Sequence, residues 1–316
     1  MFTSKGETEQ FNWIFVLVAG GIFFSFFVLF TFRYIHLQDE KQNLALSKIL
    51  ESDAIALASA GNDLDTVLQF PQPATLTTTC FANKTSLSIN TQDTPRVLDS
   101  SVLLFAPPVT SNLRLSAWTN QWYQPYYLGN FLFLSNPETH FSLLYESQYQ
   151  SLVESLRFSS SSKIERHALP TIPTLSSGST VVLFMQSSPS VSFLNQFQNV
   201  TLLVVSPDQH KVSFPLENNS AFVYSHPSLL IGAIVSGSGH QFSCQAQRAS
   251  SRFATVNQFY TAKANLLQQK VQGCSYTALS TALQSYPAQL SRQPALEQQL
   301  TTMNSNLLGN GCPGVF

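Results

Sequence analysis

One uninterrupted apolar stretch, Phe11–Phe32, constrains this chain more than any other feature of its sequence. No charged residue lies between Glu9 and Arg33, and Phe, Val, Ile, Leu, Gly and Ala make up nearly all of the stretch. As a helix its 22 residues span roughly 33 Å, enough for a hydrocarbon core of about 30 Å. Because a helix satisfies its own backbone hydrogen bonds, it is the single-pass structure that lipid tolerates. We therefore predict a short tail over 1–10, a transmembrane helix over 11–33, and the lipid bilayer as a partner.

The helical pattern continues beyond the apolar stretch. From Tyr34 to about Ala60, apolar and polar residues alternate without Pro or Gly, and Gly61-Asn62 supplies a C-cap signal. This predicts a stalk helix over 34–62 that continues the membrane span as one rod. The apolar stretch exceeds the 7–15 residues of a cleavable secretory signal, and no small-x-small site follows it, so an uncleaved signal anchor is the favoured interpretation.

An alternative interpretation concerns Lys5-Gly6, just upstream of the apolar helix. This dipeptide resembles the end of a type IV pilin-like leader, which would be cut after Gly6. The pilin pattern usually places a Glu five residues into the mature chain, whereas here Glu7 would be first and Glu9 third. Because of Lys5-Gly6, a pilin-like assembly subunit is the alternative function, although the position of the glutamates departs from the pilin pattern.

Charge and cysteine usage bear on the location of the remaining chain. The net charge is −1 and charged residues make up 10%, against about 25% in an ordinary soluble domain. Such a surface lacks the clustered basic face that nucleic acid requires, so we expect no nucleic-acid partner. All four cysteines follow the anchor, without a CxxC pair or a histidine at zinc spacing, which favours disulfides in an oxidising compartment over a metal site. Four buried free thiols are the alternative.

The cations that flank the membrane span favour the opposite orientation to the one that the cysteines indicate. Lys5 and the amino terminus precede the span, whereas Arg33, Lys41 and Lys48 follow it. The positive-inside rule alone would place the C-terminal domain in the cytoplasm, but the rule weakens for long translocated domains. We give more weight to the cysteines and the charge-poor composition, and predict a domain outside the cytoplasm.

Residues 63–240 predict a β-rich α/β domain. Val181–Met185 and Thr201–Ser206 are compact apolar runs typical of buried strands, and Pro189–Phe197 can form a helix between them, which gives a β-α-β unit. A short helix is expected over Gln148–Phe158. The other expected strands, rich in β-branched and aromatic residues, are Thr75–Phe81, Thr85–Asn90, Val97–Ala106, Leu113–Trp118, Tyr127–Ser135, Phe141–Tyr145, His210–Phe214, Ala221–Tyr224 and Leu229–Val235.

Residues 241–316 change to a helical period and predict a helical bundle. Apolar residues recur at steps of three and four from Phe242 to Val271, and two shorter helices are expected over Ser275–Tyr286 and Pro294–Leu308. If the two shorter helices form an antiparallel hairpin, Cys274 lies beside Cys312, within the Cα separation of about 7 Å that a disulfide allows. Cys80 and Cys244 would then pair, which is one of three possible connectivities.

The histidines and hydroxyl groups form no recognisable catalytic or metal motif. No two of the six histidines stand within five residues of each other, which excludes a helical metal pair of the HExxH kind. The segment Gly232–Gly237 lacks the Lys of a phosphate loop and is interpreted as a strand-to-helix turn. Ser236–His240 does not meet G-x-S-x-G and is interpreted as a turn with a surface His. We expect no catalytic residue, metal or cofactor; a membrane-bound enzyme of unknown type is the alternative.

Seven aromatic residues crowd a 16-residue segment that also contains Pro125. Rings beside amide side chains can stack on a sugar or receive the apolar side chains of a partner protein. The alternative is a core strand and turn that anchor the sheet. The candidate binding residues are Trp118, Trp122, Tyr123, Tyr126 and Tyr127.

Several short segments, spread over most of the chain, carry a resemblance to known proteins. They are Lys5-Gly6 leading into Phe11–Val16, the Trp118/Trp122 stretch with Gly129–Phe133, the run Leu230–Ile234, and the terminal Gly311-Cys312-Pro313. Together they resemble uncharacterised single-span, membrane-anchored envelope proteins of small-genome archaea. The resemblance implies an envelope location and no activity.

The predicted fold class is α/β: a transmembrane helix continuing into a stalk helix, a mixed β-rich external domain over 63–240 and a helical bundle over 241–316. The predicted function is that of a non-enzymatic, single-pass envelope or cell-surface protein. It would act through contacts with other envelope proteins or with glycans.

Overall fold

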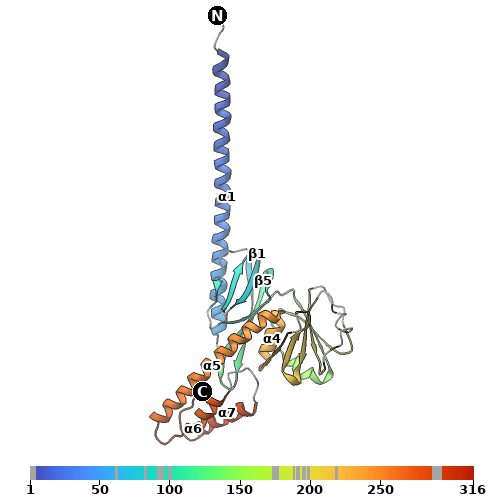
Figure 1. Cartoon of the computed structure of the whole chain (residues 1–316), viewed down its shortest axis with the longest axis vertical. Helices are drawn as coiled ribbons and strands as arrows, with labels where there is room; N and C mark the ends of the chain where they lie inside the picture. The colour runs from blue at the N-terminus through green and yellow to red at the C-terminus, as the bar shows by residue number, and fades with distance from the viewer. Residues whose placement is uncertain are drawn as a thin grey trace. The chain divides into compact units, whose positions relative to one another are not determined.

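The computed structural model describes residues 5–60, 63–81, 84–90, 96–98, 102–172, 178–187, 189, 193, 197, 200–217, 220–286 and 294–316. The chain divides into two units, Met1–Ile49 and Leu50–Phe316, and each is described by itself. A long N-terminal helix is followed by two mixed groups of strands and then by C-terminal helices. The predicted class, a mixed α/β fold with a long apolar N-terminal helix and C-terminal helices, is confirmed (Figure 1).

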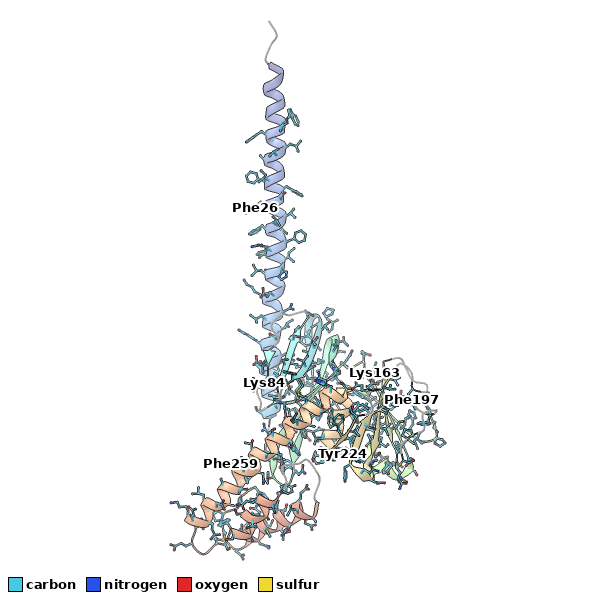
Figure 2. All side chains as sticks on the ribbon, viewed as in Figure 1. Phe26, Lys84, Lys163, Phe197, Tyr224 and Phe259 are labelled. Carbon is cyan, nitrogen blue, oxygen red and sulfur yellow. A yellow bond between two sulfur atoms is a disulfide. The ribbon has the colours of Figure 1, made fainter. Side chains whose placement is uncertain are left out.

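The N-terminal helix α1 runs from Lys5 to Ser59. It therefore begins within the predicted tail and ends close to the predicted stalk end; Gly61-Asn62, the predicted cap, lies outside the described residues. Most large apolar side chains between Trp13 and Phe32, such as that of Phe26, project from the helix without cover (Figure 2). Among the residues whose structure is described, α1 is the one helix long and apolar enough to cross a membrane, with a mean hydropathy of 2.5 over its most apolar window.

The last turns of α1 belong to the second unit. Leu50, Ala54 and Leu57 are buried there, at the i, i+4, i+7 spacing of one helix face. The Nδ2 group of Asn130 donates hydrogen bonds to the carbonyl oxygens of Ala58, at 3.3 Å, and Ala60, at 2.5 Å. Because the last carbonyls of a helix have no partner within the helix, this side chain completes the C-terminus of α1.

The first sheet has six strands in the order β3-β2-β1-β5-β6-β4. All neighbours are antiparallel except β4 and β6, which are parallel. The predicted single strand Val97–Ala106 is wrong, because this stretch contains two short strands that lie at opposite edges of the sheet. The strands are β1 (Asp65–Phe81), β2 (Lys84–Ile89), β3 (Arg96–Val97), β4 (Leu103–Phe105), β5 (Val109–Tyr123) and β6 (Tyr127–Ser135).

The second sheet has the order β12-β11-β10-β9-β7-β8. Strands β8, β7, β9 and β10 are parallel, whereas β11 and β12 extend the sheet antiparallel. The parallel pairing of β9 with β10 confirms the predicted β-α-β pairing, and most of the predicted helix Pro189–Phe197 lies outside the described residues. The strands are β7 (His140–Tyr145), β8 (Lys163–Ala168), β9 (Thr180–Phe184), β10 (Thr201–Ser206), β11 (Lys211–Phe214) and β12 (Ser220–Val223).

Two short connections of the second sheet are helical. The helix expected over Gln148–Phe158 is present as the 3-10 turn η1 (Ser147–Tyr149) followed by α2 (Gln150–Ser155), and it ends earlier than predicted. A second 3-10 turn, η2 (Pro207–Gln209), joins β10 to β11. Strand β8 was not predicted, because most of its residues are charged or polar and the segment resembles a polar loop.

The predicted strand Leu229–Val235 is wrong, because this run forms the helix α4 (Pro227–Ser236). Pro227 occupies the first turn, the Nδ1 atom of His226 accepts a hydrogen bond from the backbone N–H of Ser228, and Gly237 ends the helix at φ 59°. Residues 228–236 are all buried, so the helix has no polar face from which a helical period could be recognised. The predicted strand-to-helix turn over Gly232–Gly237 is therefore also wrong.

Three further helices complete the fold: α5 (Gly239–Lys270), α6 (Thr277–Ser285) and α7 (Pro294–Gly309). Helix α5 contacts β1, β4 and β6 of the first sheet as well as α4 and α6, and α6 contacts α7 (Figure 1). One continuous apolar core joins both sheets to α4–α7, with members such as Phe105, Phe184, Phe242 and Leu300. This core joins the two sheets and the C-terminal helices of the unit Leu50–Phe316, and a second, smaller cluster that includes Leu144, Leu183 and Val204 packs on the second sheet.

Candidate functional site

Three of the five aromatic residues predicted to bind a partner are core residues. Trp118, Trp122 and Tyr126 are 2%, 0% and 3% exposed. The ring of Trp122 stacks on that of Phe131, with centroids 4.9 Å apart, and Trp118 stacks on Phe133 at 5.2 Å. Because Trp118 and Trp122 are an even number of residues apart on β5, they share one face of the strand, and that face is buried. The prediction of a binding surface is wrong for these three residues, and the core alternative describes them.

The other two residues of this set lie at the surface. Tyr123 and Tyr127 are 52% and 40% exposed, and their ring centroids are 5.3 Å apart. The hydroxyl of Tyr127 donates to Oδ1 of Asn130 at 3.1 Å. The pKa of Tyr127 is raised from its ordinary value, mainly by burial. The nearby Arg252 opposes this shift, and Tyr123 adds to it. A pair of rings is therefore what remains of the predicted aromatic surface.

The four cysteines lie in two pairs at disulfide distance, and the pairs are those that the helical-hairpin prediction gives. Cys80 on β1 pairs with Cys244 on α5, with Cα atoms 5.9 Å apart; we call this the core disulfide. Cys274, before α6, pairs with Cys312, after α7, at 6.0 Å; we call this the C-terminal disulfide. No cysteine is free.

Hydrogen bonds beside the core disulfide attach α5 to the β1–β2 hairpin. The Nε2 group of Gln241 donates to the carbonyl oxygen of Thr78 at 2.7 Å, and that of Gln245 donates to Oγ1 of Thr85 at 2.6 Å. Both glutamine side chains are buried. The covalent link and the buried hydrogen bonds therefore hold the same two elements together.

The segment around His240 is a helix-to-helix turn. His240 lies exposed in the first turn of α5, as the prediction of a surface histidine requires. The carboxylate of Glu217 accepts hydrogen bonds from the Ser238 hydroxyl, at 3.3 Å, and from the Gly239 N–H, at 2.7 Å. Within the described part of the chain, no three His, Cys, Asp or Glu side chains gather into a group that could hold a metal ion.

The carboxyl edge of the parallel strands is the place where α/β sheets usually bind ligands. Here Glu146 follows β7, and its Oε2 accepts hydrogen bonds from the N–H of Gln186, at 3.0 Å, and from Gln148, at 3.2 Å. The hydroxyl of Tyr149 donates to Asp208 at 2.9 Å. Both carboxylates thus link loops that follow different strands, which is a structural role.

A cavity of about 320 Å³ lies at the opposite, amino edge of the same strands. Thr180 and Thr201 stand at the beginnings of β9 and β10, and Ser135 stands at the end of β6. Thr110, near the start of β5, and Ser236, the last residue of α4, also belong to the polar part of the wall, as do Asn136 and Thr139. We call this space the hydroxyl cavity; it lies where the two sheets and the C-terminus of α4 meet.

Three hydroxyl groups in the wall of the hydroxyl cavity have no hydrogen-bond partner. They belong to Thr110, Ser135 and Ser236, which are 6%, 0% and 0% exposed. Leaving a buried polar group unpaired typically costs about 1–3 kcal/mol. Six buried side-chain polar atoms lack a partner among the described residues, and three of them belong to residues that line this one cavity.

Neither the hydroxyl cavity nor its unpaired groups carry a signal in the sequence, because the wall is built from short polar stretches far apart in the chain. No family model, no curated protein and no solved structure matches the chain.

Proposed function

We propose that the chain is a single-pass membrane protein whose disulfide-containing unit lies outside the cytoplasm. It would act there as a non-enzymatic envelope or cell-surface protein, through contacts with other envelope proteins or with glycans. The observation that carries the proposal is the pairing of all four cysteines at disulfide distance. Disulfides persist in oxidising compartments and are rare in the cytoplasm, where thiols are kept reduced.

The membrane part of the proposal is supported by the side chains of the first unit. The consecutive residues 14–17 (Ile, Phe, Val and Leu) are all strongly exposed, and at 100° per residue they project to all sides of the helix. A helix that is apolar on all faces is stable either in the core of a protein or in lipid. Its most apolar window has no buried residue, so lipid is the environment that accounts for it.

The orientation is tested with the full chain carrying a different peptide tag at each end, expressed in cells that are then converted to spheroplasts. Protease added outside should remove the C-terminal tag and leave the N-terminal tag intact. A matched variant with Arg33, Lys41 and Lys48 replaced by glutamine removes the flanking cations that oppose this orientation, and should give the same result. Protection of the C-terminal tag in the unaltered chain would refute the proposed location.

A second candidate is a pilin-like assembly subunit cleaved after Gly6. The observation that favours it is the continuity of α1, which is helical from Lys5 to Ser59 and combines a fully exposed apolar segment with buried positions such as Leu50 and Ala54. An exposed apolar helix can pack against the same helix of other copies. N-terminal sequencing of the native protein decides: a mature chain that starts at Glu7 and sediments as a polymer supports this candidate, and an uncut N-terminus excludes it.

A further inference from the structure

We propose that the hydroxyl cavity binds a small, neutral, polyhydroxylated molecule of the size of a monosaccharide. The ligand class follows from the cavity wall alone, so this binding would occur whichever side of a membrane the unit Leu50–Phe316 occupies. It adds a small-molecule site to the protein contacts proposed above.

The unpaired hydroxyls are the reason to expect a ligand rather than simple packing. In folded proteins the large majority of buried polar side-chain atoms have a hydrogen-bond partner, so each exception calls for an explanation. Thr110, Ser135 and Ser236 come from β5, β6 and α4, yet all three residues line one cavity. Each side chain has a single torsion, χ1, and a rotation about it can turn the hydroxyl towards a ligand in the cavity.

The chemistry of the wall selects an uncharged ligand. None of the residues that line the cavity carries a charge, and a buried ion without a countercharge would be strongly disfavoured. Six of the lining residues bear a hydroxyl group: Thr110, Ser135, Thr139, Thr180, Thr201 and Ser236. A hydroxyl both donates and accepts, so it pairs with the hydroxyls of a sugar or polyol in either direction.

The apolar part of the wall and the volume fit the same class. Pro107, Phe141 and Val235 contribute apolar surface, against which the C–H groups of a sugar ring can pack. The volume of about 320 Å³ is at the small end of the roughly 300–1,000 Å³ found for ligand sites. A single ring therefore fits the space better than an oligosaccharide.

The end of α4 adds a preference for hydrogen-bond donors. The last carbonyl groups of a helix have no partner within the helix and carry partial negative charge. Val235, Ser236 and Gly237, which end α4, all line the cavity. Ligand hydroxyls can donate to this edge while they accept from serine and threonine.

The test uses the full chain in detergent micelles and saturation-transfer difference NMR with glucose, galactose, N-acetylglucosamine and glycerol as probes. At least one of these should bind, and Ser135→Ala and Ser236→Ala should each weaken the binding by about tenfold, which corresponds to one lost hydrogen bond. Because these hydroxyls have no partner in the protein, removing them should leave the folded state at least as stable, which thermal unfolding would verify.

Ser162→Ala is the matched control, because the Ser162 hydroxyl is also buried without a partner but does not line the cavity. It should leave the binding unchanged. The proposal is overturned if none of the four probes binds at up to about 0.1 M, far above the Kd of about 1 mM expected for a small ligand. It is also overturned if Ser135→Ala and Ser236→Ala bind the probes as tightly as Ser162→Ala does.

Discussion

Replacing Gly232 by alanine should destabilise the unit Leu50–Phe316, although alanine is the better helix former. Gly232 lies within α4, and a Cβ atom added there would be 2.6 Å from Cδ1 and 2.7 Å from Cε1 of Phe105. The Phe105 ring is completely buried and has the rings of Phe131, Phe133 and Phe242 around it, at centroid distances of 5.6, 5.8 and 6.3 Å. The ring therefore has little room to move away.

The magnitude follows from two opposing effects. Alanine in place of glycine within a helix gains about 1 kcal/mol of helix propensity. Carbon atoms pack best at about 3.5–4.0 Å, so the new methyl group overlaps two ring atoms by about 1 Å. Overpacking of a core typically costs about 1–3 kcal/mol, and an overlap with a confined ring belongs at the upper end. We expect a net loss of about 1–2 kcal/mol in the free energy of unfolding.

The assay is denaturant unfolding of the full chain in detergent micelles under non-reducing conditions, followed by the fluorescence of the buried Trp118 and Trp122. Gly309→Ala is the matched control, since Gly309 is the last residue of α7 and nothing lies within 4 Å of an added Cβ. This control should lose no stability. Phe105→Leu combined with Gly232→Ala should cost at least about 0.5 kcal/mol less than the sum of the two single variants, because the smaller side chain relieves the overlap.

If Gly232→Ala lost no more stability than Gly309→Ala does, α4 could not pack on β4 as described. The close approach of Gly232 to Phe105, which supports the helix Pro227–Ser236, would then also be wrong.

Two further predictions concern stability. Burial raises the pKa of Tyr126 above the ordinary value of 10.0, and burial together with the nearby Glu297 raises that of Tyr286. The contribution of these two tyrosines to the free energy of unfolding is therefore complete below about pH 10 and is lost as the pH rises further. Denaturant unfolding should show stability falling above that pH by at most about 1.4 kcal/mol per unit for each tyrosine, with a smaller slope in Tyr126→Phe; an unchanged slope would contradict this. Replacing both cysteines of one disulfide by alanine should lower the free energy of unfolding, by up to about 5 kcal/mol for the core disulfide and about 4 kcal/mol for the C-terminal one. The core disulfide should cost more because it closes the longer loop, with a sequence separation of 164 against 38. The opposite order of unfolding midpoints would contradict the loop-entropy argument.

Local patterns in the sequence predicted much of this fold. The apolar period from Phe242 onward predicted α5, and Pro294 and Gly309 bounded α7 correctly. The cysteine pairing followed from the helices alone. In contrast, Leu229–Val235 is apolar at every position except Gly232, and such a run has no period that separates a buried strand from a buried helix. Pro227 before this run and Gly237 after it are typical of the two ends of a helix, and this signal was missed.

The candidate sites were harder to predict than the elements. The aromatic segment was recognised, but which rings face the core depends on how β5 lies on its neighbours: Trp122 is buried while the adjacent Tyr123 is exposed. The hydroxyl cavity was not predicted at all. Thr110, Ser135 and Ser236 each follow or precede an apolar run like many other polar residues, and only the meeting of the two sheets with α4 brings them together.

The redox state of the cysteines in the native protein tests the central claim most directly. Membranes are isolated with an alkylating reagent present, and the protein is digested without reduction and mapped by mass spectrometry. We predict no alkylated cysteine and two linked peptide pairs, Cys80 with Cys244 and Cys274 with Cys312. Four alkylated cysteines would contradict the proposed location outside the cytoplasm.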